Sequence, residues 1–112
     1  MNAQIKIFGS RRRTEVLVLV ALLSETYPTE LARLLGAPLY SVQNIVDALD
    51  RQGVLATQIS GNSRRVSLDP RFFAFKELRA LLLRVAEAEP ELRKAAARRR
   101  SRPRRARKPL VS

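Results

Sequence analysis

The sequence predicts a mainly α-helical domain with one small β-hairpin, an α+β fold. Three observations predict it. Apolar residues recur at helical spacing in several segments between residues 11 and 88, and residues 55–68 alternate with a period of two around a Ser-Gly-Asn-Ser turn. The 112 residues suffice for one hydrophobic core. We therefore expect one domain at residues 11–92, preceded by an N-terminal arm (1–10) and followed by a basic, disordered tail (93–112).

The first expected helix covers residues 11–24. Gly9 and Ser10 offer a break and an N-cap before it. Its interior, residues 16–23, is apolar almost all round, which is typical of a helix at the centre of a core or an oligomer. The valines of this segment also suit a strand. A helix is the better interpretation because the segment is longer than an ordinary strand and begins at a cap signal.

Two short helices are expected next, at residues 28–35 and 38–52. Pro28 suits the first position of one, and Gly36 suits a left-handed residue at its end. In the other, the apolar residues fall at spacings of three and four: Val42, Ile45, Val46 and Leu49. Two short helices joined by a two-residue turn are typical of a helix-turn-helix, whose second helix enters a DNA groove.

The alternating segment at residues 55–68 follows Gly53. Its Gly61-Asn62 pair tolerates the positive φ of a tight turn, so a two-stranded hairpin is expected, with Arg64 and Arg65 just past its tip. This hairpin has the dimensions of a wing.

A long final helix is expected from about Phe72, and its apolar stripe comprises Phe75, Leu78, Leu82 and Val85, with Leu81 beside it. This face is wider than a small domain needs. We therefore expect a homodimer that pairs through the first and last helices. Pro90 either ends the helix or restarts it.

The net charge of +12 is unevenly distributed. Ten of the 22 basic residues lie from Arg93 onward, where no acidic residue occurs, so the preceding part is only about +2. Residues 98–108 are mainly arginine with Ser, Pro and Ala, a composition that favours disorder. The charge therefore belongs mainly to the tail, and the function of the domain has to be inferred from its pattern.

The composition excludes most enzyme classes. Without cysteine or histidine there is no thiol nucleophile, imidazole base or usual zinc ligand, so we expect neither catalysis nor a cofactor nor a metal. The longest apolar run, residues 16–23, is too short to cross a bilayer, and the N-terminus lacks the pattern of a signal peptide. A cytoplasmic, nucleoid-associated location and no membrane contact are the expectation.

The order of elements resembles the winged-helix regulators of the ArsR and MarR type over roughly residues 10–88. The strongest stretch, residues 31–55, is similar without gaps to the family pattern ELAxxLGxSxxxVxxxLxxLxxxGLV. Residues 68–83 are similar to small winged-helix proteins found alone or ahead of nucleotidyltransferase domains. Pro38 and Tyr27 depart from the pattern because they replace the usual capping residues, and metal sensing is not implied because its cysteine and histidine ligands are missing.

The resemblance implies a homodimeric, sequence-specific transcriptional regulator that binds double-stranded DNA. Residues 38–52 would be the recognition helix in the major groove, and residues 55–68 the wing on the backbone or in the minor groove. Glutamine and asparagine suit adenine, and three arginines at the start of the first helix oppose its dipole, which hints at an external anion. The candidate DNA contacts are Leu39, Tyr40, Ser41, Gln43, Asn44, Arg64, Arg65, Arg11, Arg12 and Arg13.

Two alternatives stay open at this stage. In one, the arginine-rich tail binds nucleic acid without sequence preference and the domain only dimerises. In the other, the domain is a protein-interaction module without DNA readout. Asp47 and Asp50 favour the second alternative, because carboxylates repel a phosphate backbone.

Overall fold

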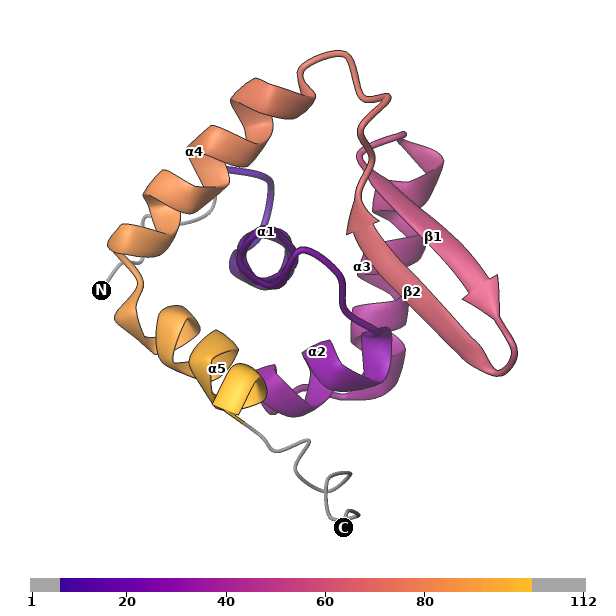
Figure 1. The fold of residues 1–112 in the computed structure, drawn as a ribbon, viewed down its shortest axis with the longest axis horizontal. Coiled ribbons are helices and arrows are strands. Elements are labelled where there is room, and N and C mark those ends of the chain that lie inside the picture. Colours follow the sequence, from indigo (N-terminus) through magenta and orange to yellow (C-terminus); the bar gives the residue numbers. More distant parts are fainter. Residues whose placement is uncertain (1–6, 102–112) are drawn as a thin grey trace, which may run out of the picture.

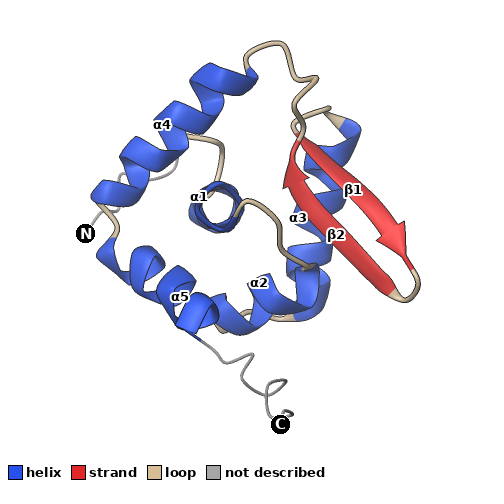
Figure 2. Cartoon of the chain, in the orientation of Figure 1, coloured by secondary structure: helices blue, strands red, loops and turns tan. Residues whose placement is uncertain are grey.

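The computed structural model describes residues 7–101, and side chains through residue 99 (Figures 1 and 2). This part of the chain contains five helices and one antiparallel hairpin, in which Leu55 pairs with Leu68 and Ser60 with Ser63. The α+β fold predicted from the sequence is confirmed. The elements are α1 (Arg11–Leu23), α2 (Pro28–Leu35), α3 (Leu39–Arg51), β1 (Leu55–Ser60), β2 (Ser63–Leu68), α4 (Phe75–Glu87) and α5 (Pro90–Ser101).

Local signals in the sequence account for the ends of the first two helices. The Ser10 hydroxyl accepts a hydrogen bond from the Arg13 amide at 3.1 Å and caps α1. Gly36 ends α2 with φ +62°, a left-handed conformation that a residue with a β-carbon adopts only at a cost of about 1 kcal/mol. Both residues act as the sequence predicts.

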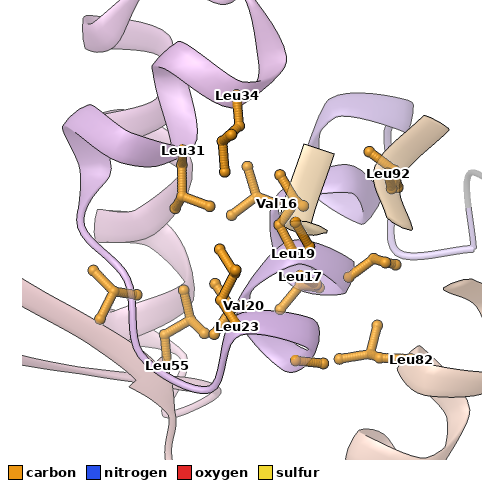
Figure 3. Packing of buried hydrophobic residues seen from close by; sticks show 14 of the residues in the cluster. Val16, Leu17, Leu19, Val20, Leu23, Leu31, Leu34, Leu55, Leu82 and Leu92 are labelled. Atoms are coloured by element: carbon orange, nitrogen blue, oxygen red, sulfur yellow. The ribbon is translucent and has the colours of Figure 1, made fainter. Parts of the chain in front are cut away.

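Helix α1 lies at the centre of the domain. Figure 1 shows it end-on, surrounded by α4, α5, α2 and the hairpin with α3, and it contacts all of them. Val16, Val18 and Leu19 are completely buried. Figure 3 shows the side chains of α1 between Leu31 on one side and Leu82 on the other. Nearly all apolar side chains of α1 are therefore buried within a single chain. The sequence also predicts this helix in a dimer interface. The dimer itself stays a prediction.

The predicted start of the basic tail is wrong, because residues 93–101 form most of α5. Pro90 occupies the first position of this helix and restarts the chain after α4. Leu92, Ala95 and Ala96 fall at helical spacing and are buried, and α5 packs on α1 and α2. The restart at Pro90 is one of the two alternatives that the sequence left open. The disorder predicted for residues 102–108 and the arm at residues 1–6 lie outside the described residues.

Helix α4 begins at Phe75, whereas the sequence predicts a start at about Phe72. A hydrogen-bonded turn precedes this helix. The Asp69 carboxylate accepts hydrogen bonds from the Arg71 amide at 2.8 Å and from the Arg71 guanidinium at 3.2 Å. The Asp69 amide donates to the Val54 carbonyl at 2.9 Å. The hydrogen bond from the Arg71 side chain, followed by that from the Arg71 amide, lowers the pKa of Asp69.

This turn predicts a pH-dependent contribution to stability. Because the pKa of Asp69 is lower in the folded protein, its contribution is present above the ordinary value of 3.8 and is lost as the pH falls below it. Asp69→Asn is expected to lower the free energy of unfolding at pH 7 by about 1 kcal/mol and to reduce its loss in acid. Urea denaturation between pH 7 and pH 3 measures both.

The matched control is Glu87→Gln. This carboxylate also pairs with an arginine, Arg84, but both side chains are mostly exposed, so little change is expected. Identical pH profiles for the two variants would show that the Asp69 turn does not contribute as described.

Candidate nucleic-acid interface

A groove of about 390 Å³ runs between the start of α2, the middle of α3 and the tip of the wing. The linker before α2 keeps the wing in place, because Thr26 and Val66 of β2 exchange two backbone hydrogen bonds, at 3.0 and 2.8 Å. The groove is lined by Tyr27, Pro28, Thr29, Gln43, Asn62, Ser63 and Arg64.

Helix α3 has one buried side and one exposed side, as the sequence predicts. Its buried residues are Val42, Val46 and Leu49. Tyr40, Gln43 and Asn44 are exposed, and their spacings of three and four place them in one row along the helix. Tyr40 is 69% exposed and Leu39 is 38% exposed. The Ser41 hydroxyl donates to the Pro38 carbonyl at 3.2 Å.

Two carboxylates of α3 bind the wing. Asp47 accepts a hydrogen bond from the Arg64 guanidinium at 2.6 Å, and Asp50 accepts one from the Thr57 hydroxyl at 2.8 Å. Since Thr57 lies on β1 and Arg64 on β2, both strands are joined to the helix. From the sequence, Asp47 and Asp50 favour a module without DNA readout, whereas in the structure both carboxylates position the wing.

The first turns of α2 and α3 have no side-chain cap. Tyr27 and Pro38 occupy the two N-cap positions, and neither makes a capping hydrogen bond, as their residue types predict. Amides in the first turn of a helix have no partner within the helix, and its N-terminus carries a partial positive charge. Both features favour a nearby anion.

The end of α5 is anchored beside the linker that leads into α2. Arg99 donates to the Glu25 carbonyl at 2.9 Å and pairs with the Glu30 carboxylate at 3.2 Å. The Glu25 carboxylate lies 3.9 Å from the guanidinium of Arg65 on the wing. Arg99 therefore holds the end of α5 against the linker and the first turn of α2.

Arg11, Arg12 and Arg13 lie away from this groove. The first two pair with Glu15 one turn further along α1, and Arg13 donates to the side chain of Gln52, the C-cap residue of α3, at 2.7 Å. The 13 residues of α3 span about 20 Å, so the Arg13 guanidinium lies roughly one helix length from Leu39. The sequence suggested an external anion beside these arginines. In the structure the Glu15 carboxylate supplies the negative charge next to Arg11 and Arg12.

The predicted contacts therefore form two groups: those on α3 and the wing, and the three arginines at the start of α1. Gln43 and Arg64 line the groove. Sequence reasoning missed Thr29, Asn62 and Ser63, which line it too. The signals were available, since Pro28 marks the start of α2 and the Ser-Gly-Asn-Ser turn marks the wing tip, but only the fold shows that these two places face each other.

The order of helices and hairpin defines a winged helix-turn-helix fold. A crystal structure of the AntR antimony-specific transcriptional repressor has the same fold. Its TM-score with this protein is 0.54, the sequences are 24% identical, and the similarity covers 78% of this chain and 76% of that one. No protein-family model matches the sequence, and a search of curated proteins finds no match.

Residues 7–101 contain neither a cluster of metal-ligating side chains nor a membrane-spanning helix. No three histidine, cysteine, aspartate or glutamate side chains in this part of the chain lie together as metal ligands would. None of its helices is long and apolar enough to cross a membrane.

Proposed function

We propose that this protein is a sequence-specific, DNA-binding regulator of transcription, with α3 in the major groove and the wing on the backbone or in the minor groove. The observation that carries the proposal is the exposed row of Tyr40, Gln43 and Asn44, which adjoins the groove leading to the wing tip. A transcriptional repressor with the same fold supports the general class.

Each element of the interface has a chemical role in this proposal. The amides of Gln43 and Asn44 read adenine, which offers a paired donor and acceptor in the major groove. Leu39 contacts a thymine methyl group, and the Tyr40 hydroxyl donates to a phosphate. The Ser41 hydroxyl donates to a second phosphate oxygen once it turns away from the Pro38 carbonyl. The uncapped first turn of α2 receives a phosphate oxygen at the other wall of the groove.

The wing contributes cations that already have partners in the free protein. Arg64 pairs with Asp47, and Arg65 lies near Glu25. The 2.6 Å contact holds the Arg64 guanidinium over α3, so DNA meets an arginine whose position is already set. Arg11, Arg12 and Arg13 are not part of this proposed contact surface.

The regulator acts as a homodimer in this proposal, through the outer side of α4. Leu81 is 44% exposed on this helix, and the partly buried Leu78 and Val85, which also pack against the core, lie about one turn to either side of it. A second copy that covers this side of α4 would place two recognition helices about 34 Å apart, one turn of DNA. The DNA site is then a palindrome.

No metal or metalloid response is part of the proposal. The structural neighbour is described as antimony-specific, but the present sequence contains no cysteine to supply a soft thiolate ligand.

Selection of bound fragments from random DNA at moderate salt is expected to yield one palindromic motif. Gln43→Ala and Asn44→Ala are then each expected to weaken binding to that motif by about 1–3 kcal/mol and to relax preference at particular base pairs. Binding to unrelated DNA should change little, because phosphate contacts remain. Fluorescence anisotropy with the motif and a scrambled duplex measures the difference.

Gln52→Ala is the matched control, since it removes the same amide at the opposite end of the recognition helix. It should leave base preference unchanged. If Gln43→Ala and Asn44→Ala also leave every DNA affinity unchanged, the protein-interaction module becomes the better interpretation. Failure to select any motif would instead favour nonspecific binding by the tail.

A further inference from the structure

The outer face of α5 is strongly basic. This helix contains five basic residues and one acidic residue, a net charge of +4. Leu92, Ala95 and Ala96 turn toward the core. The exposed side chains on the other sides of the helix are those of Glu91, Arg93, Lys94, Ala97 and Arg98. Such a face suits an anionic partner, whereas a second copy of the same face would be repelled.

The cations of this face are little compensated within the protein. Lys94 and Arg98 are four residues apart, and like charges at this spacing destabilise a helix. The Glu91 carboxylate lies 3.7 Å from the Lys94 ammonium, but both side chains are mostly exposed, so this pair contributes little. Within residues 7–101, Arg93 has no ion-pair partner. An external anion would offset the repulsion.

The last turn of α5 lies at the edge of the proposed DNA surface. Figure 1 shows it beside α2, and Arg99 pairs there with the Glu30 carboxylate at 3.2 Å. The Arg33 guanidinium of α2 lies 3.9 Å from the same carboxylate oxygen, so two guanidiniums share one negative charge. The residues just before Glu30, Pro28 and Thr29, line the groove that leads to the wing. A basic surface therefore continues from α2 onto α5.

We infer that the outer face of α5 binds the phosphate backbone of DNA beside the base pairs that α3 contacts, with Arg93 and Lys94 as phosphate contacts. This inference rests on the proposed DNA binding and adds a second contact surface to it. The 12 residues of α5 span about 18 Å, a length that corresponds to roughly five base pairs. Phosphate contacts carry no base information, so the length of the flanking DNA matters and its sequence does not.

Two duplexes test this surface: a short one that contains only the selected motif, and a long one with about ten further base pairs on each side. The double variant Arg93→Gln with Lys94→Gln, in the full-length protein, is expected to lose about tenfold affinity for the long duplex near 50 mM salt. On the short duplex it should lose less than about twofold. On the long duplex, the magnitude of the slope of log K against log salt should fall by up to about 1.8. Fluorescence anisotropy measures all three quantities.

The control variant removes the same charge elsewhere. Lys76→Gln with Arg79→Gln replaces two exposed cations in the first half of α4, far from α5 (Figure 1), and should keep the full gain from flanking DNA. The exchange Arg93→Lys with Lys94→Arg retains both charges and should bind both duplexes as the natural protein does. Circular dichroism shows whether α5 is folded in each variant.

Four outcomes separate this inference from the proposed function. Equal losses on the short and long duplexes would overturn the α5 contact, as would an equal loss in the α4 variant. A motif that the natural protein and the α5 variant bind equally on both duplexes would overturn the α5 contact and leave the proposed function standing. If no motif can be selected but the α5 variant alone binds long duplexes more weakly, the proposed sequence readout fails and the α5 contact stands. Absence of all DNA binding would overturn both.

Discussion

Replacing Leu19 by alanine is expected to lower the free energy of unfolding by about 2–5 kcal/mol. Leu19 is fully buried at the centre of α1, and the elements packed around this helix leave little room for collapse into the resulting cavity (Figure 3). A loss of this size is a large part of the stability of a small domain, which is about 5–15 kcal/mol. Urea denaturation followed by circular dichroism measures it.

Leu39→Ala is the control for this substitution. The same side chain is removed from a helix, but Leu39 is 38% exposed at the first position of α3, so a loss below about 1 kcal/mol is expected. Equal losses in the two variants would show that α1 is not the centre of the core.

Removing residues 102–112 is expected to weaken DNA binding by about 10²–10³-fold at low salt without changing which motif is preferred. Five basic residues are lost, and each phosphate contact they make releases counterions on binding, so the magnitude of the slope of log K against log salt should fall by up to about 4.5. Affinity measured between 50 and 200 mM salt on the selected motif and on a scrambled duplex tests this. The deleted basic residues are Arg102, Arg104, Arg105, Arg107 and Lys108.

A variant in which these five residues become glutamine separates charge from chain length. It should match the truncated protein, since α5 and its Arg99 anchor are intact in both. If either variant loses nearly all binding, to the motif and the scrambled duplex alike, the tail supplies the DNA affinity, and the tail-driven alternative is favoured.

The parts of the fold that were predicted correctly are those with strong local signals. Ser10, Gly36 and the Gly61-Asn62 turn set element ends through backbone geometry, and these effects operate whatever surrounds them. For α5 the sequence left open whether Pro90 ends the preceding helix or restarts it, because the apolar stripe that follows is short and lies among basic residues. Its burial depends on α1 and α2, which lie far away in the sequence.

The candidate site shows the same division between local and distant information. Exposure of Tyr40, Gln43 and Asn44 follows from the helical period, so it could be predicted from the sequence alone. The partners of Asp47 and Arg13 are 17 and 39 residues away, and no local pattern indicates them. The groove could not be predicted either, because three separate segments of the chain form its walls.

The two carboxylate contacts between α3 and the wing have a consequence for DNA shape. Asp47 and Asp50 hold the hairpin through Arg64 and Thr57, so the helix and the wing approach a duplex as one rigid body. A duplex whose groove is too wide or too narrow for that fixed spacing must deform, at an energy that depends on its sequence. Base pairs that no side chain touches would then also contribute to the choice of binding site.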